Sequence, residues 1–215
     1  EPSTPAPAAA KQLGIFMLCG FFDDDLVQFM RGWPKCDLVT ASRVWANVPD
    51  PVAFLEQVKH LLLPEGRFII ETGYLPNILE KMLVETVYHE HISYDLAYPI
   101  AQLCADHDLV LTHVERVGIK GGSVRLTIQL QGEPDYTVAE ALQGERVWLA
   151  SNPWEWFKQR LEAEWERIAE NLCEGGKVCG YGAGVPGTAL IFQLGLADKL
   201  SWVIDEQERY WGSYV

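Results

Sequence analysis

Residues 36–73 have the sequence CDLVTASRVWANVPDPVAFLEQVKHLLLPEGRFIIETG, in which two secondary-structure periods alternate. Residues 36–41 have the composition of a short buried strand. The next segment carries apolar side chains at helical spacing, at positions 52, 54, 55, 58, 61 and 62, and Pro64-Glu65-Gly66 predicts its end. Residues 66–73 then predict a second strand. A strand, a helix and a strand in this order predict a right-handed crossover between two parallel strands.

The segment 108–130 follows a different pattern. DLVLTHVERVGI and SVRLTIQL are rich in β-forming residues, and Lys120-Gly121-Gly122 joins them. Two such runs around a glycine-containing turn predict an antiparallel hairpin. A parallel sheet that finishes in this way is typical of class I methyltransferases. We therefore expect an α/β fold that holds the rear part of such a Rossmann-like sheet.

The remainder of the chain predicts long helices and then a smaller α/β unit. After a polar connection and a short helix in residues 131–150, Asn152 and Pro153 predict the N-cap and first residue of an amphipathic helix. Its apolar stripe favours core or interdomain packing over a ligand cage, and Gly175-Gly176 predicts its end. The stripe comprises Trp154, Phe157, Leu161, Trp165, Ile168 and Leu172.

Residues 177–205 repeat the order of strand, glycine-rich turn, helix and strand. The segments are KVCGYGAG, VPGTALIFQLGL and LSWVID, the last of which ends at Asp205. We expect a C-terminal Rossmann-like unit here. The predicted domains are 1–131, a connection with the amphipathic helix over 132–176, and 177–215.

Composition limits the classes of partner and compartment. The chain has 215 residues, with 17 Lys and Arg against 30 Asp and Glu, so its net charge is −13. This balance argues against a nucleic-acid partner. The five cysteines form no CxxC pair, which argues against a disulfide framework and a zinc site and favours the reducing cytoplasm. The longest apolar run, residues 13–22, is too short to cross a bilayer, and no signal peptide precedes it.

The densest group of reactive side chains is TVYHEHISY, residues 86–94. Imidazole is well suited to remove a proton near neutral pH, and Tyr88 and Glu90 stand beside His91 to orient it or to stabilise an enolate. Two other interpretations stay open. His89 and His91 would point to one face of a strand and bind a metal, or the whole group would be polar residues satisfied at a helix start.

The turn GYGAGVPGT, residues 180–188, is a candidate nucleotide site. Gly180 and Gly182 fit the dinucleotide pattern, but Val185 stands at its third glycine position, so a tight packing turn is an equal alternative. Asp205 would contact a ribose or base. Glu1 and Glu71 are acidic residues of the kind that hold a ribose diol at a strand end, and the residues alone decide neither case.

Together these stretches resemble the S-adenosylmethionine-dependent sugar C-methyltransferases, which act on nucleotide-linked 4-keto deoxysugars. The matching segments are VWANVPDPVAFLEQVKHLLLPEGRFIIET, TVYHEHISYDL, VERVGIKGGSVRL and GYGAGVPGT with VID and Gly212. In that family a zinc-binding domain comes first, then a methyltransferase domain with a glycine-rich cofactor loop, then a Rossmann-like domain that helps to bind the nucleotide sugar. The chain begins at Glu1 and stops at Val215, so we expect a fragment that starts after the zinc domain and the loop.

The resemblance also implies roles for individual residues. His91 would be the base, supported by Tyr88 and Glu90. Glu1 would hold the cofactor ribose, and Gly20, Phe21 and Phe22 would lie beside its adenine. The substrate would contact Gly121, Gly122, Ser123, Gly182, Gly187 and Asp205. No metal site is expected in this chain, because the zinc belongs to the preceding domain.

The sequence departs from the family at positions that matter for the substrate. Asn47 stands where a histidine is common, Pro186 where a lysine is usual, and Tyr210 where a basic residue is expected. Lost cations weaken the case for a diphosphate and favour a changed substrate. A non-catalytic nucleotide-binding relative is the main alternative, followed by an NAD-linked oxidoreductase. The acceptor and the oligomeric state stay undecided, and we expect the chain alone to bind S-adenosylmethionine poorly.

Overall fold

The computed structural model describes residues 6–173 and 176–212. Four strands form the larger sheet: β1 (Cys36–Ser42), β2 (Leu62–Gly73), β3 (Val110–Val117) and β4 (Ser123–Gln129). Their order is β1-β2-β4-β3. β1 and β2 are parallel, and β4 is antiparallel to both of its neighbours. The predicted parallel pair and the antiparallel hairpin are therefore confirmed, with the last strand inserted in the middle of the sheet.

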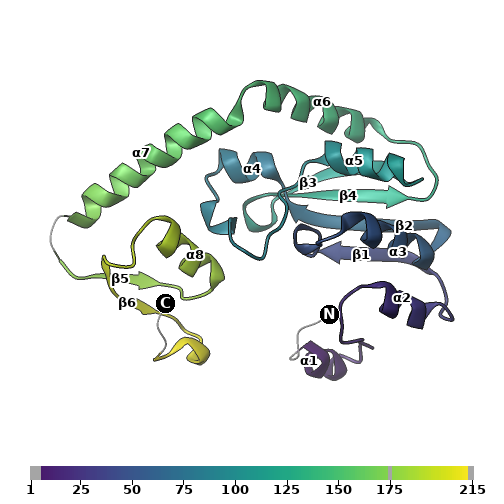
Figure 1. The fold of residues 1–215 in the computed structure, drawn as a ribbon, viewed down its shortest axis with the longest axis horizontal. Coiled ribbons are helices and arrows are strands. Elements are labelled where there is room, and N and C mark those ends of the chain that lie inside the picture. Colours follow the sequence, from purple (N-terminus) through teal and green to yellow (C-terminus); the bar gives the residue numbers. More distant parts are fainter. Residues whose placement is uncertain (1–5, 174–175, 213–215) are drawn as a thin grey trace.

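The helices of this half pack around that sheet (Figure 1). α3 (Pro51–Leu61) joins β1 to β2, and α5 (Ala97–Asp106) precedes β3. Asp50 caps α3 by accepting a hydrogen bond from the Ala53 N–H at 2.9 Å. The fully buried side chains Leu55, Phe68 and Leu126 lie in the core between helices and sheet. Shorter elements complete the half: α1 (Ala6–Gln12), α2 (Asp24–Met30), η1 (Trp45–Asn47), α4 (Leu75–Glu80), η2 (Val84–Thr86) and η3 (Ile119–Gly121).

The end of α3 differs from the sequence prediction. The helix ends at Leu61 and β2 begins at Leu62, so Pro64-Glu65-Gly66 lies inside the strand. The register between β1 and β2 shifts there: Cys36 pairs with Leu62, and Leu38 pairs with Arg67. The extra residues form an irregularity at the start of β2, which absorbs the turn residues without ending the strand.

Two consecutive helices lead from the sheet to the C-terminal part (Figure 1). α6 (Tyr136–Ala150) has 15 residues, so the prediction of a short helix was wrong. α7 (Pro153–Cys173) begins at the predicted proline. Asn152 has a φ of 54°, in the left-handed region rather than the extended conformation of an N-cap, so that part of the prediction was also wrong. Gly175 lies outside the described residues.

The C-terminal part contains β5 (Val178–Tyr181), α8 (Val185–Gln193), β6 (Leu200–Ile204) and η4 (Glu208–Tyr210). β5 and β6 pair in parallel and form a separate two-stranded sheet. The predicted smaller α/β unit is therefore confirmed as an arrangement of elements. None of the helices in the described residues is long and apolar enough to cross a membrane.

Candidate active site

The segment 86–94 forms a turn at the carboxyl ends of β1 and β2. The Ile92 and Ser93 N–H groups both donate to the Ala46 carbonyl, at 2.7 and 3.2 Å. The His91 N–H donates to the Tyr88 carbonyl at 3.1 Å, which closes the turn. These backbone bonds hold the histidine-containing segment against η1. The segment is therefore positioned by the end of β1 and not by a helix start.

The His91 ring is fixed by a hydrogen bond within this turn. Nδ1 lies 2.7 Å from the Thr86 carbonyl oxygen. A carbonyl oxygen only accepts, so Nδ1 carries a proton, and in the neutral ring the lone pair is on Nε2. The Tyr88 ring packs at 4.4 Å between centroids and the Tyr94 ring at 6.1 Å. The geometry thus leaves Nε2, not Nδ1, as the ring nitrogen that can accept a proton.

His91 lines a small cavity of about 50 Å³ between the turn and the sheet. The cavity also receives Thr72 and Gly73 from β2, Arg43 from the end of β1, and Gly122 from the hairpin. The other lining residues are Ala46, Ile78, Leu83, Thr86, Ser93, Tyr94 and Lys120. Two residues predicted separately, His91 and Gly122, are therefore brought to one cavity.

The glycine at position 122 is required by its surroundings. Gly122 has a φ of 141°, and a Cβ built on it would lie 1.8 Å from Nδ2 of Asn77. Neither the backbone conformation nor the space admits another residue. The hairpin turn therefore sits directly on α4, beside the cavity. Gly121 is close to the Leu83 side chain in the same way.

Arg43 was not predicted from the sequence as a site residue, yet it joins β1 to the hairpin. It has a φ of 59°. Its Nη2 donates to Ser123 Oγ at 2.8 Å and to the Ile119 carbonyl at 3.3 Å. Its Nε is buried without a hydrogen-bond partner. Ser123 therefore reaches the site through Arg43, and the positively charged side chain is fixed at the cavity wall.

Asp95 was also missed, and it lies beneath the cavity. Its side chain accepts hydrogen bonds from Thr72 Oγ1 at 2.6 Å and from Ser93 Oγ at 3.1 Å. Burial raises the pKa of the Asp95 carboxyl, while the two hydroxyl groups and nearby His91 oppose that rise. The residue types alone gave no signal for this network, because Thr72 and Asp95 are 23 positions apart.

Tyr88 and Glu90, the two predicted neighbours of His91, have different surroundings. Burial and then the negative charge of Glu90 raise the pKa of Tyr88, which keeps its phenol protonated at neutral pH. Glu90 is exposed and does not line the cavity. His89 lines a second, larger cavity, so the two imidazole rings do not converge on one point. Within the described residues no group of three or more His, Cys, Asp or Glu could hold a metal ion.

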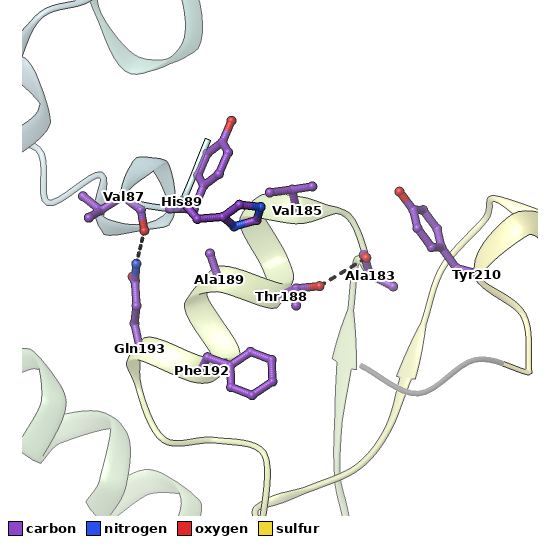
Figure 2. A pocket seen from close by; sticks show the side chains of 10 residues that line it. Val87, His89, Ala183, Val185, Thr188, Ala189, Phe192, Gln193 and Tyr210 are labelled. Atoms are coloured by element: carbon purple, nitrogen blue, oxygen red, sulfur yellow. Dashed lines mark hydrogen bonds between the residues drawn. The ribbon is translucent and has the colours of Figure 1, made fainter. Parts of the chain in front are cut away.

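The second cavity, of about 640 Å³, lies between the turn and α8 (Figure 2). Val185, Ala189 and Phe192 give it an apolar wall, and Tyr88, His89 and Tyr210 add polar groups. Gln193 Nε2 donates to the Val87 carbonyl and joins α8 to the turn. The remaining lining residues are Val87, Ala183, Thr188 and Gln193, so the cavity contains no Lys or Arg.

The glycine-rich turn before α8 is closed by its own residues. A Cβ on Gly187 would lie 2.3 Å from the Gly182 carbonyl oxygen, so the helix start packs against the turn. Asp205 Oδ2 accepts a hydrogen bond from the Ala183 N–H at 2.7 Å. Gly182, Gly187 and Asp205 therefore form one compact turn.

Of the residues predicted to contact a cofactor, the structure describes Gly20, Phe21 and Phe22. Glu1 lies outside the described residues. Gly20 and Phe21 precede α2, and the Phe21 side chain is 72% exposed. Phe22 instead packs against Phe54 at 4.8 Å between ring centroids. Phe21 is therefore the residue of this pair that offers an open aromatic face to a planar base.

Comparison with known proteins relates the chain to one family. Residues 118–215 match the family model described as the C-methyltransferase C-terminal domain. The chain is 31% identical to the C-methyltransferase NovU of Streptomyces niveus over 172 residues. This alignment covers 75% of the present chain and 41% of NovU. The chain therefore spans about two fifths of the length of this relative.

Solved structures with a similar fold are more distant. A SAM dependent methyltransferase from Aquifex aeolicus is 13% identical, with a TM-score of 0.42 over 59% of this chain and 62% of that chain. The mitomycin 7-O-methyltransferase MmcR is 15% identical, with a TM-score of 0.44 over 58% of this chain and 38% of that chain.

Proposed function

We propose that the chain serves S-adenosylmethionine-dependent methylation of a carbon next to a ketone, on the strength of the match of residues 118–215 to the C-methyltransferase C-terminal domain and the 31% identity to NovU. The acceptor class we propose is a nucleotide-linked keto sugar. The observation that carries the proposal is the His91 imidazole, whose Nδ1 donates to the Thr86 carbonyl and whose ring lines the 50 Å³ cavity. That arrangement supports an unprotonated Nε2 as the base.

The proposed reaction begins with proton transfer to His91. The C–H bond next to the carbonyl breaks, the proton goes to Nε2, and the electron pair forms an enolate whose charge rests on the carbonyl oxygen. The guanidinium of Arg43, fixed by Ser123 and Ile119, supports a role in stabilising this oxyanion. Lys120 lines the same cavity and adds a second positive charge. Tyr88 and Glu90 are proposed to support His91 from the solvent side.

The methyl donor is proposed to bind to the residues that precede β1. When bound, S-adenosylmethionine would supply an electrophilic methyl group: the methyl–sulfur bond would break as the enolate carbon forms the new C–C bond, and the neutral thioether S-adenosylhomocysteine would leave. Phe21 fits the adenine of such a molecule, because its exposed ring offers a stacking surface. Glu1 is proposed to hold the ribose, and Gly20 to leave space beside the base. Phe22 contributes by fixing this segment on Phe54.

The acceptor is proposed to contact both halves of the chain. Gly121, Gly122 and Ser123 stand on the sheet side, and Gly182, Gly187 and Asp205 form the turn beside the larger cavity. The apolar wall and Tyr210 of that cavity suit a flat, weakly charged group such as a nucleobase. The boundaries 1–131, 132–176 and 177–215 are proposed as a partial methyltransferase domain, its connection and a substrate-binding unit.

The role of His91 is tested by His91→Asn in the protein incubated with thymidine diphosphate-linked 4-keto-6-deoxyglucose. We expect exchange of the α-proton with D₂O, measured by NMR, and methyl transfer both to fall by about 10²- to 10⁴-fold. His60→Asn is the control, because His60 is exposed on α3. Undiminished exchange in His91→Asn would remove the base from the mechanism. Binding without exchange in the wild type would favour a non-catalytic nucleotide-binding protein.

A further inference from the structure

The polar groups beneath the His91 cavity form a network with a fixed direction. Thr72 Oγ1 donates to Asp95 Oδ2 at 2.6 Å, and Ser93 Oγ donates to Asp95 Oδ1 at 3.1 Å. Each carboxylate oxygen therefore receives one hydroxyl proton. Thr72 and Ser93 both line the cavity, whereas Asp95 lies behind them.

Asp95 cannot leave this position without disturbing the sheet. The residue is 6% exposed, and its carbonyl oxygen accepts a hydrogen bond from the Leu75 N–H at 3.0 Å. It also forms a parallel β-bridge with Tyr74, which follows β2. The backbone on both sides of the network is therefore fixed. A rotation of the carboxylate would leave the buried Thr72 hydroxyl and the half-buried Ser93 hydroxyl without their acceptor.

The direction of these hydrogen bonds decides what the cavity can recognise. A hydroxyl group has one proton to donate and two lone pairs to accept with. The Thr72 and Ser93 hydroxyl groups both donate their proton to Asp95. On the cavity side, their oxygen atoms can therefore only accept hydrogen bonds. Together with the lone pair on Nε2 of a neutral His91, the Thr72 and Ser93 oxygens form an acceptor wall, and the Tyr94 hydroxyl is the neighbouring group of the lining that can also donate.

Two basic residues of the same lining have the reverse character. Arg43 and Lys120 can only donate hydrogen bonds, and Arg43 has a buried Nε that lacks a partner. A ligand that satisfies both groups of residues must present an acceptor to Arg43 and Lys120 and an O–H donor to the acceptor wall. A ketone with a hydroxyl group on a neighbouring carbon has this pattern.

We propose that the Thr72–Asp95–Ser93 network is a specificity determinant that selects acceptors with a free hydroxyl group next to the reacting ketone. This inference rests on the proposed function, because it concerns the ligand of the same cavity. It adds a restriction on the ligand. A ketone whose neighbouring hydroxyl group is methylated, removed or replaced by fluorine cannot donate to the Thr72 and Ser93 oxygens, and should bind more weakly. The carbonyl oxygen of the preferred ligand would face Arg43, which orients the α-proton toward His91.

Three substitutions separate the parts of the network. Thr72→Val and Ser93→Ala each remove one acceptor and keep the size of the side chain similar or smaller. Asp95→Asn keeps the shape but introduces an amide that can donate, which frees one hydroxyl proton for the cavity. Thr112→Val is the matched control, because Thr112 is a buried threonine of β3 that bonds to Gln129 and Thr127. Circular dichroism and urea unfolding check that each variant folds.

The probes are thymidine diphosphate-linked 4-keto-6-deoxyglucose and its 3-fluoro counterpart. Fluorine keeps the size of the oxygen but cannot donate. We expect wild type and Thr112→Val to bind the hydroxyl probe about tenfold to a hundredfold more tightly in isothermal titration. Thr72→Val and Ser93→Ala should reduce that ratio, and Asp95→Asn should bring it close to one.

The outcomes distinguish this inference from the proposed function. Equal binding of the two probes by the wild type would overturn the specificity role, even if α-proton exchange through His91 were intact. A preserved preference without any exchange would overturn the catalytic role of His91 and leave the selection of a hydroxyl group standing. A preference that survives unchanged in Asp95→Asn and Thr72→Val would also overturn the inference. If neither probe bound to wild type, the acceptor class and the inference would fall together.

Discussion

The two sheets of this chain are covered to very different degrees. In the four-stranded sheet, helices bury side chains on every strand, including Phe68 and Leu126 at 0% exposure. Among the described residues of the C-terminal unit, only Ile191 and Leu194 are buried apolar side chains. Several large ones are more than 45% exposed: Tyr181, Phe192, Trp202, Ile204 and Trp211. The part with the four-stranded sheet has a hydrophobic core. The described residues of the C-terminal unit follow the strand, helix and strand order of a Rossmann-like unit but bury few apolar side chains.

This difference shows where each half obtains its stability. A two-stranded sheet with one helix buries too little apolar surface to be stable alone. The C-terminal unit therefore depends on its neighbours, and the hydrogen bond from Gln193 to the Val87 carbonyl joins it to the turn that carries His91. The half with the four-stranded sheet is expected to keep its fold when the C-terminal unit is disturbed, and the reverse is not expected.

The largest effect is expected from shortening a side chain in the centre of the larger sheet. Leu126 pairs with Ile70 on one side and with Val114 on the other. We expect Leu126→Ala to lower the free energy of unfolding by about 3 kcal/mol, from lost burial and the cavity left behind. The matched change Ile204→Ala, at a residue of β6 that is 49% exposed, should cost less than about 1 kcal/mol.

Urea unfolding followed by circular dichroism measures both values. Similar losses for the two variants would mean that the C-terminal unit has a core comparable to that of the sheet. The comparison between the halves would then fail. A loss for Ile204→Ala that appears only in a separate, earlier transition would sharpen it, because it would show that the unit unfolds independently.

A smaller effect is expected from a buried carboxylate that joins three elements of the first half. Glu145 of α6 is 2% exposed and accepts hydrogen bonds from the Ala97 N–H, the Tyr98 N–H and the Tyr74 hydroxyl, at 2.6, 2.8 and 3.0 Å. Glu145→Ala leaves these donors unpaired and should cost about 2 kcal/mol in urea unfolding. Glu206→Ala is its counterpart in the C-terminal unit.

Glu206 accepts one exposed hydrogen bond, from the Tyr181 hydroxyl at 2.5 Å. Its removal should leave the urea midpoint nearly unchanged, because water replaces the lost partner. If Glu145→Ala were as mild as Glu206→Ala, α6 would not be held to the sheet through its carboxylate. Glu145→Gln, which keeps an acceptor oxygen, should lie between wild type and Glu145→Ala.

Much of the fold could be predicted because its signals are local. The helical spacing in residues 51–62, the β-rich runs around Lys120-Gly121-Gly122 and the glycine-rich turn before α8 each lie within a short window. One error has a clear physical cause. Pro64-Glu65-Gly66 was expected to end the helix before a strand that starts at residue 66, but pairing with β1 extends β2 back to Leu62, and this pairing depends on residues distant in sequence.

The residues that line the His91 cavity could be predicted only in part, and their roles stay a prediction. His91 could be chosen because histidine, tyrosine and glutamate stand together, and Gly122 because a hairpin needs a turn. Arg43 could not be chosen, because its partner Ser123 is 80 positions away and arginine on a strand end is common. Asp95 was hidden for the same reason. Residues that act through long-range contacts become visible only when the sheet brings them together.

The smallest expected effects concern how the stability of the two halves changes with pH. In the first half, hydrogen bonds from Thr137 and then His113 lower the pKa of Asp135 to about 2. Since the folded pKa is below the ordinary value of 3.8, this carboxylate stabilises the fold above about pH 4, and that contribution is lost as the pH falls toward 2. In the C-terminal unit, the hydrogen bond to Glu206 raises the pKa of Tyr181 above 10. Its contribution is present below pH 10 and is lost at higher pH.

Asp135→Asn and Tyr181→Phe test this pair with little change of shape. Asparagine still caps the start of α6, so the variant removes the charge and keeps the cap. The urea midpoint of wild type should exceed that of Asp135→Asn at pH 6 and converge with it near pH 2. The small advantage over Tyr181→Phe should be present at pH 7 and disappear above pH 10. A difference between wild type and Asp135→Asn that stays constant from pH 6 to 2 would show that neutral hydrogen bonds, not the ionised carboxylate, join α6 to β3.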